Sequence, residues 1–134
     1  MDTDEGVLSE ADRDAIVATA TDYIASWLEG DAHRMARALH PDLAKRSVDV
    51  GPSGRCVRVT SLTAQDMIAA TAEGRGTKNR AGHEVKILDA SGGIASVKVT
   101  SVPYVDYLQV ARFDDRWLIV NVLWRPRVFD GRGR

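Results

Sequence analysis

The alternation of apolar and polar residues predicts an antiparallel sheet in the second half of the chain. Four strands are expected at about residues 83–89, 94–102, 105–113 and 117–125, joined by short turns rich in glycine, proline or aspartate. The last strand contains the segment WLIVNVLW, which is apolar on both faces and has Asn121 as its only polar residue. A strand with one wet face should alternate apolar and polar residues, so we expect both faces of this strand to be covered.

Three helices are predicted in the first half of the chain, where apolar residues recur at three- and four-residue steps. The first spans about residues 9–29, the second about residues 32–39, and the third follows Thr63. Short strands are expected at about residues 43–50 and 56–60, on either side of a Gly-Pro-Ser-Gly turn. This order of elements predicts an α+β fold, in which about three N-terminal helices pack on a curved, mostly antiparallel sheet.

The turn between the last two strands sets their expected register. If Asp114 and Asp115 form a two-residue turn, Phe113 pairs with Arg116 and the other pairs follow by counting. Residues directly opposite share a face, whereas a slip of one residue exchanges the faces. One face then carries Val105, Tyr107, Gln109, Ala111, Val120, Val122 and Trp124. The other carries Asp106, Leu108, Val110, Arg112, Trp117, Ile119, Asn121 and Leu123.

These two faces are expected to have different roles. The face with Tyr107, Gln109 and Trp124 mixes aromatic rings with an amide, a composition typical of ligand pockets. The alternative is a core that the helices cover, in which Tyr107 and Gln109 merely satisfy hydrogen bonds. The opposite face is expected to lie against a second copy of the chain. The sequence thus predicts a homodimer whose interface contains Trp117, Ile119, Asn121 and Leu123.

Composition narrows the class of protein. A chain of 134 residues is expected to form a single domain, with residues 1–8 and 126–134 as flexible tails. The net charge of −1 gives no reason to expect nucleic acid or an anionic membrane as a partner. A single cysteine and three dispersed histidines indicate no metal site, and we expect no cofactor. No apolar run is long enough to cross a bilayer and the first residues are acidic, so a cytoplasmic protein is expected.

Two segments carry a resemblance to a known superfamily: DYIASWLEGDAHRMARALHPDLAKR near the start and YVDYLQVARFDDRWLIVNVLW near the end. They resemble the nuclear transport factor 2-like superfamily, the cone-shaped α+β fold of ketosteroid isomerases, scytalone dehydratase and SnoaL-type cyclases. Within it the chain looks most similar to small bacterial proteins described as putative lumazine-binding. The resemblance covers nearly the whole chain and implies the cone fold, but it does not imply one reaction.

The ketosteroid isomerase pattern can be compared residue by residue. Tyr23 matches the helix tyrosine that donates a hydrogen bond to the substrate oxygen, and Trp124 matches the pocket tryptophan. The position of the donating acid holds Gln109, and the position of the catalytic base falls on Val48, beside Asp49. Abstraction of a proton from carbon needs a placed carboxylate base, so the isomerase mechanism is not expected unless a bulge turns Asp49 inward.

Three hypotheses of function follow. The first is a small-molecule-binding protein with an apolar, aromatic pocket formed by Tyr23, Trp27, Met67, Tyr107, Gln109 and Trp124. The second is a dehydratase, cyclase or isomerase in which Tyr23 is the donor and His40 or Asp49 the base. The third is a non-catalytic dimeric interaction module whose cone is filled by side chains. Alternatives remain for single residues: Tyr23 and Trp27 have the spacing of core aromatics, and His40 suits a helix cap.

Overall fold

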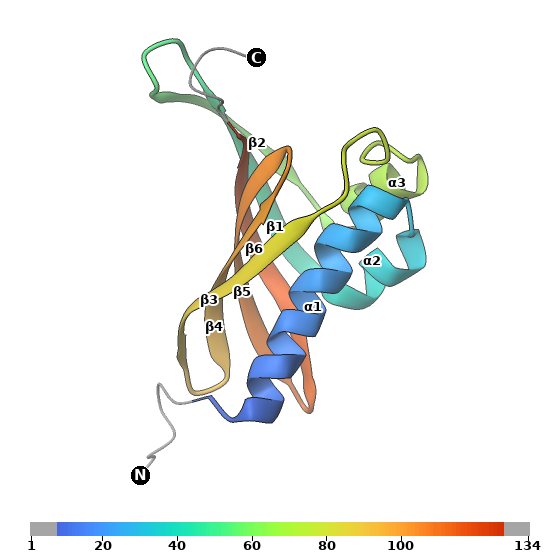
Figure 1. Cartoon of the computed structure of the whole chain (residues 1–134), viewed down its shortest axis with the longest axis vertical. Helices are drawn as coiled ribbons and strands as arrows, with labels where there is room; N and C mark the ends of the chain where they lie inside the picture. The colour runs from blue at the N-terminus through green and yellow to red at the C-terminus, as the bar shows by residue number, and fades with distance from the viewer. Residues whose placement is uncertain (1–7, 128–134) are drawn as a thin grey trace.

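The computed structural model describes residues 8–127, and within them it has three helices and six strands. The helices are α1 (Glu10–Glu29), α2 (Ala32–Ala38) and α3 (Ala64–Ala72). The strands are β1 (Leu39–Val50), β2 (Cys56–Leu62), β3 (His83–Ser91), β4 (Ile94–Ser101), β5 (Tyr104–Phe113) and β6 (Arg116–Pro126). Figure 1 shows the helices gathered on one side of a curved sheet, which confirms the predicted α+β fold. The expected tails lie outside the described residues, except for residue 8 and residues 126–127.

Local capping explains where α1 and α3 begin and end. The Ser9 hydroxyl accepts a hydrogen bond from the backbone N–H of Asp12 at the start of α1. The helix stops at Gly30, whose φ of 76° is a left-handed conformation that glycine adopts without strain. Thr63 and Asp66 form a reciprocal capping box at the start of α3. These short-range contacts are the part of the fold that the sequence shows most directly.

The sheet has the strand order β2-β1-β6-β5-β4-β3, and β6 therefore lies near its centre. Strand β1 pairs with β6 in parallel, while each other neighbouring pair is antiparallel. Strand β1 begins directly after α2, so His40 and Pro41 belong to a strand that is longer than the predicted segment at residues 43–50. Strand β6 thus has a neighbouring strand along each of its edges, and such a central position agrees with its apolar composition.

The predicted hairpin register is correct only near the turn. Phe113 lies opposite Arg116, as expected, and the count holds as far as the pair Val110 and Ile119. A bulge then adds Val120 to β6, because Gln109 lies opposite Asn121. One extra residue reverses the alternation of faces beyond it.

The bulge makes several predicted positions wrong. Asp106 and Leu108 share the helix-covered face with Val122 and Trp124, and each of these four residues is more than half buried. Tyr107 and Gln109 lie on the opposite, outer face, as do Asn121 and Leu123. Trp117 and Ile119, expected at a subunit interface, are buried against the helices. The Trp117 indole N–H donates to Asp12 of α1, 3.1 Å away.

The core lies between α1 and the inner face of the sheet. Burial of apolar side chains here supplies the main stabilisation of the fold, at about 25 cal/mol per Å² removed from water. The fully buried apolar residues at this interface include Ile16, Ala20, Ile24, Val97, Val99, Leu108, Val110 and Ile119. Of the helices in residues 8–127, none combines the length and the apolar character needed to cross a membrane.

Candidate functional site

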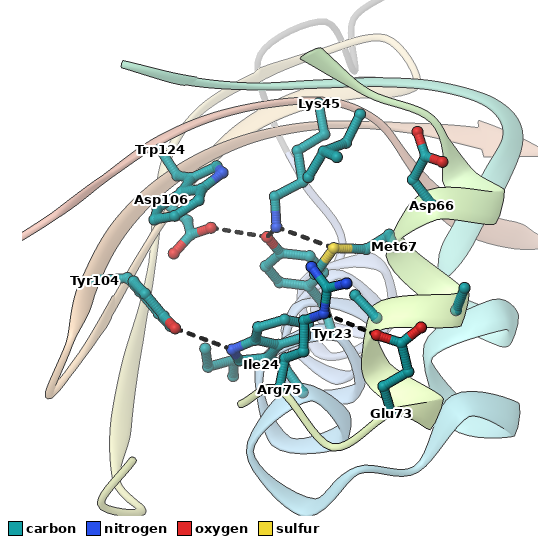
Figure 2. Close-up of a pocket in the computed structure, with 14 residues that line it drawn as sticks. Tyr23, Ile24, Lys45, Asp66, Met67, Glu73, Arg75, Tyr104, Asp106 and Trp124 are labelled. Atoms are coloured by element: carbon teal, nitrogen blue, oxygen red, sulfur yellow. Dashed lines mark hydrogen bonds and ion pairs between the residues drawn. The ribbon is translucent and has the colours of Figure 1, made fainter. Parts of the chain in front are cut away.

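A cavity of about 580 Å³ lies between the helices and the sheet and is lined by residues of α1, α3, β1, β5 and β6. Aromatic side chains form much of its wall: Tyr23, Trp27, Tyr104 and Trp124. Figure 2 shows Lys45 and Asp106 reaching towards Tyr23 from the sheet, with Met67 facing them from α3. The cone is therefore open to a small molecule and is not filled by its own side chains.

Three buried polar side chains form a hydrogen-bonded chain in this cavity. Lys45 Nζ on β1 donates to Tyr23 Oη on α1 over 2.7 Å, and the Tyr23 hydroxyl donates to Asp106 Oδ2 on β5 over 2.8 Å. Their exposed fractions are only 4%, 2% and 2%, so this chain is shielded from bulk water. A hydroxyl thus stands between an amine and a carboxylate (Figure 2).

Aromatic rings surround the Lys45 amine. Nζ lies 5.0 Å from the ring centre of Tyr23, 5.8 Å from that of Trp27 and 5.3 Å from that of Trp124. Each distance is within the range of a cation–π interaction. Met67 Sδ accepts a hydrogen bond from the same nitrogen at 3.2 Å. These contacts hold the amine at the cavity wall.

Burial shifts the pKa values of all three groups towards their neutral forms. Burial lowers the pKa of Lys45 to about 8, although the charge of Asp106 opposes the shift. Burial also raises the pKa of Asp106, against the influence of Lys45 and of the Tyr23 hydrogen bond. The pKa of Tyr23 lies well above its usual value, because of burial first and the Asp106 charge second. Tyr23 therefore remains a hydrogen-bond donor, and part of the Lys45 population is a neutral amine near physiological pH.

Two buried polar atoms of the cavity lack a hydrogen-bond partner among residues 8–127: Asp106 Oδ1 and Trp124 Nε1. One is an acceptor and the other is a donor. An unsatisfied buried group of this kind destabilises a fold by about 1–3 kcal/mol. Each atom exposes less than 1 Å² of surface, so a bound molecule would pair with it only after the side chain turns towards the cavity.

The loop after α3 closes one side of the cavity. The Trp27 indole N–H donates to Tyr104 Oη at 3.2 Å, and Asn79 Nδ2 donates to the same oxygen at 3.2 Å. Gly76 packs so closely on Trp27 that a Cβ atom there would lie 2.4 Å from the indole nitrogen. At the rim, Arg75 pairs with Glu73 at 2.8 Å, and both side chains are more than half exposed.

The structure brings together four of the residues predicted for the pocket: Tyr23, Trp27, Met67 and Trp124 line the cavity. Tyr107 and Gln109 do not. Tyr107 is 46% exposed on the outer face of the sheet, and Gln109 there accepts a hydrogen bond from Asn121 Nδ2. The reason is the bulge at Val120. Beyond it, the residues of β6 that share a face with Tyr107 and Gln109 are Asn121 and Leu123, and no longer Val122 and Trp124.

Neither predicted base lies at the cavity. His40 packs against Phe113 in a tilted arrangement with ring centres 4.7 Å apart, and its Nδ1 accepts a hydrogen bond from the backbone N–H of Asp42. Asp49 pairs with Arg58 on the neighbouring strand, with 2.6 Å between Oδ2 and Nη2. The second hypothesis therefore loses both of its proposed bases.

Lys45 and Asp106 were missed by sequence reasoning. Asp106 takes the place beside Tyr23 that the sequence comparison had given to Gln109. The alternation of Asp106 with Leu108 and Val110 was a usable signal for its burial. For Lys45 the signal was weak, because the exposed Arg46 follows it directly and nothing local separates the two cations. No cluster of three or more metal-ligating side chains occurs in the part of the chain that the structure describes.

Comparisons with known proteins agree with this architecture. A family model described as putative lumazine-binding matches residues 11–125. An NTF2-like protein of unknown function from Silicibacter pomeroyi is 17% identical, with a TM-score of 0.68 over 90% of this chain and 100% of that one. A ketosteroid isomerase-like protein from Erwinia carotovora atroseptica is 14% identical, with a TM-score of 0.64 over 90% of this chain and 99% of that one. These identities show a shared fold alone, and none of the curated proteins matches the chain.

Proposed function

Since the chain belongs to the putative lumazine-binding family, we propose that it is a small-molecule-binding protein whose ligand occupies the cavity around Lys45. The observation that carries this proposal is the cavity together with two residues of its wall, Asp106 and Trp124, each of which keeps a buried polar atom without a partner among the described residues. Native folds satisfy nearly all of their buried polar groups, and exceptions call for an explanation. A ligand that pairs with both atoms is such an explanation.

The cavity wall indicates the chemistry of the ligand. Its volume of about 580 Å³ lies in the range of pockets that hold metabolites or drug-sized molecules. The rings of Trp27 and Trp124 favour a flat apolar or aromatic body. At the polar end, Asp106 Oδ1 calls for a donor and Trp124 Nε1 for an acceptor. The ligand that fits is a flat ring system that has a donor and an acceptor on one edge.

Lumazine is a suitable first probe. The family description names it, and it is a flat heteroaromatic compound with N–H donors and carbonyl acceptors. Isothermal titration with lumazine, together with native mass spectrometry of the purified protein, tests the proposal. We expect binding with one ligand per chain, or a copurifying aromatic compound of similar size. If no lumazine binding and no copurified ligand is found, the proposal is rejected.

A matched pair of variants locates the binding site. Asp106→Asn keeps the size of the side chain but removes the charge, and we expect it to weaken binding by about tenfold to a hundredfold, corresponding to 1–3 kcal/mol. Gln109→Leu changes an exposed amide on the opposite face of the same strand and should leave binding unchanged. Equal effects of the two substitutions would contradict binding in this cavity.

We further propose that a second copy of the chain covers the outer face of the sheet. Tyr107 and Leu123 lie opposite each other there, with 46% and 48% of their surfaces exposed. Next to them, Gln109 and Asn121 are uncharged and hydrogen-bonded to each other. A two-fold dimer brings the same patch of both copies together, so an uncharged centre avoids repulsion between like charges. Trp117 and Ile119 have no part in this interface, because the helices bury them.

Sedimentation of the protein and of Leu123→Asp tests the dimer. We expect a dimer for the unchanged protein at micromolar concentration and a monomer for the variant, because two carboxylates, one from each copy, would then meet near the centre of the interface. A control substitution has to lie on the surface but away from this patch. The exposed Val57, on the edge strand β2, meets both conditions, and Val57→Asp should leave the dimer intact. A monomeric unchanged protein would overturn this proposal.

A further inference from the structure

The amine of Lys45 is held at the wall of a cavity large enough for a small molecule, and its nitrogen lies against aromatic rings. We propose that Lys45 Nζ forms a Schiff base with the carbonyl group of an aromatic aldehyde or ketone bound in this cavity. The inference rests on the proposed function, since it names the class of ligand for the same site. It goes beyond that function by assigning covalent chemistry to a residue of the cavity.

The contacts of Lys45 differ from those of a structural ion pair. Among the described residues, Nζ contacts Tyr23 Oη and Met67 Sδ, and no ion pair within 4.0 Å joins it to a carboxylate. A lysine retained for its charge would be expected to meet Asp106 directly. Instead the Tyr23 hydroxyl separates the two groups (Figure 2). The nitrogen is thus held by one oxygen, one sulfur and the faces of aromatic rings.

The Tyr23 hydroxyl provides a route for a proton from Lys45 to Asp106. Lys45 Nζ donates to Tyr23 Oη, and Tyr23 donates to Asp106 Oδ2, so a shift of both protons along these bonds leaves a neutral amine and a neutral carboxylic acid. The net charge of the cluster does not change. Burial favours this neutral pair, because each separated charge is costly in a medium of low dielectric constant. The lowered pKa of Lys45, about 8, and the raised pKa of Asp106 have the same cause.

The neutral pair has the two groups that imine formation needs. The Nζ lone pair attacks the carbonyl carbon, and the carbonyl oxygen takes the proton of the Asp106 carboxyl group. The nitrogen then returns a proton to Asp106 through Tyr23, which leaves a neutral carbinolamine. Asp106 next protonates the carbinolamine hydroxyl, the C–O bond breaks, and water leaves as the C=N bond forms. A last proton passes from the iminium nitrogen to Asp106, so the sum is amine plus carbonyl giving imine plus water, without oxidant or reductant.

Reductive trapping tests this inference on the full chain. The protein is incubated with 2-naphthaldehyde and sodium cyanoborohydride at near-neutral pH, and the modified lysine is located by peptide mass mapping. We expect a naphthylmethyl group on Lys45, formed at least about tenfold faster than on Lys98, because burial lowers the pKa of Lys45 to about 8 and so raises its share of free amine. Lys98 lies on the outer side of β4, with Nζ 5.8 Å from the ring centre of Tyr107 and so at the edge of the proposed dimer interface; the exposed Lys78, in the loop after α3, is therefore measured as a second comparison.

Three variants separate binding from covalent chemistry. Lys45→Arg keeps a cation but cannot form an imine, and it should lose the adduct while still binding 2-naphthalenemethanol, which has no carbonyl group. Lys98→Met should retain the adduct on Lys45. Asp106→Asn should slow trapping at least about tenfold, because it keeps the shape of the side chain but removes the acid. If Lys45→Arg does not fold, the site of modification in the unchanged protein decides the question.

The possible results distinguish the two proposals. If 2-naphthalenemethanol binds but the aldehyde modifies the surface lysines as readily as Lys45, the Schiff base is refuted and ligand binding stands. If neither lumazine nor either naphthyl compound binds, both are refuted. Trapping on Lys45 at an unchanged rate in Asp106→Asn would refute the assigned role of the carboxyl group.

Discussion

Asp106 on β5 lies directly opposite Trp124 on β6, and both side chains contribute to the wall of the cavity. This pairing exists because one extra residue, Val120, bulges out of β6. With regular pairing, Leu123 would lie opposite Asp106, and Trp124 would lie on the outer face of the sheet, away from the cavity. The bulge thus brings Trp124 onto the inner face of the sheet, beside Asp106.

Replacement of Asp106 tests the energetic weight of the buried cluster. Asp106→Asn retains the packing and an acceptor for Tyr23 but leaves Lys45 without its countercharge, so we expect it to destabilise the fold by about 1–3 kcal/mol. Asp49→Asn breaks a partly exposed ion pair with Arg58 and should change stability by less than about 1 kcal/mol. Urea unfolding of both variants gives the comparison. A loss at Asp106 no larger than that at Asp49 would contradict a buried polar cluster.

The pH dependence of stability reports on Lys45. Its pKa is about 8 in the folded protein, against an ordinary lysine value of 10.5, so between these pH values the unfolded chain binds more protons. Stability contributed by this group should therefore rise as the pH increases from about 8 to about 10.5, by at most about 3 kcal/mol. Below pH 8 the full penalty for the buried charge is present.

Urea unfolding at several pH values, compared with Lys45→Met, isolates this contribution. The other ionisable groups that line the cavity are Tyr23 from α1, Tyr104 and Asp106 from β5, and Asp66, Glu73 and Arg75 from α3 and its following loop. They are present in both proteins, so the rise should vanish in Lys45→Met and persist in Lys98→Met. The same pH profile in all three proteins would show that Lys45 titrates as an exposed lysine does.

Two tryptophans provide a matched test of ligand recognition. Trp124→Phe removes an indole N–H that has no partner among the described residues, so it should weaken lumazine binding by about fivefold or more while stability stays equal or increases. Trp117→Phe removes an indole N–H that donates to Asp12, and it should lower stability by about 1 kcal/mol without changing binding. Titration calorimetry and thermal unfolding measure the two effects. Because both substitutions shrink the ring equally, a loss of stability in Trp124→Phe as large as that in Trp117→Phe would mean that the indole N–H of Trp124 is already satisfied.

Gly76 tests the wall formed by the loop after α3. A Cβ atom at this position would lie 2.4 Å from Trp27 Nε1 and 2.5 Å from the Trp27 carbonyl oxygen, so the loop or the indole has to move. We expect Gly76→Ala to destabilise the protein by about 1–3 kcal/mol and to weaken ligand binding. Gly51→Ala is a milder control, because its nearest contact is the movable side chain of Val57 at 3.1 Å. Similar melting temperatures for the two variants would show that the loop yields easily.

Much of the fold could be predicted from local patterns. The periodicity of α1, the capping residues Ser9 and Thr63 and the Asp114–Asp115 turn all act over a few residues, and each appears in the structure as expected. The same periodicity placed Tyr23 and Trp27 on the inner side of α1. Tyr107 and Gln109 were placed wrongly, since a bulge of one residue at Val120 leaves no clear mark in an almost entirely apolar strand.

The sequence by itself determined the α+β class, the helices with their caps, and the aromatic residues available for a cavity, because these depend on short-range periodicity and residue type. Only the tertiary structure decided that Lys45, Tyr23 and Asp106 meet. Lys45 and Tyr23 are 22 residues apart, and Tyr23 and Asp106 are 83 apart. A lysine in a strand is as readily exposed as buried until a hydroxyl, a sulfur and aromatic rings from other elements surround it. That environment, and with it the chemistry of the site, arises from packing between α1, β1 and β5.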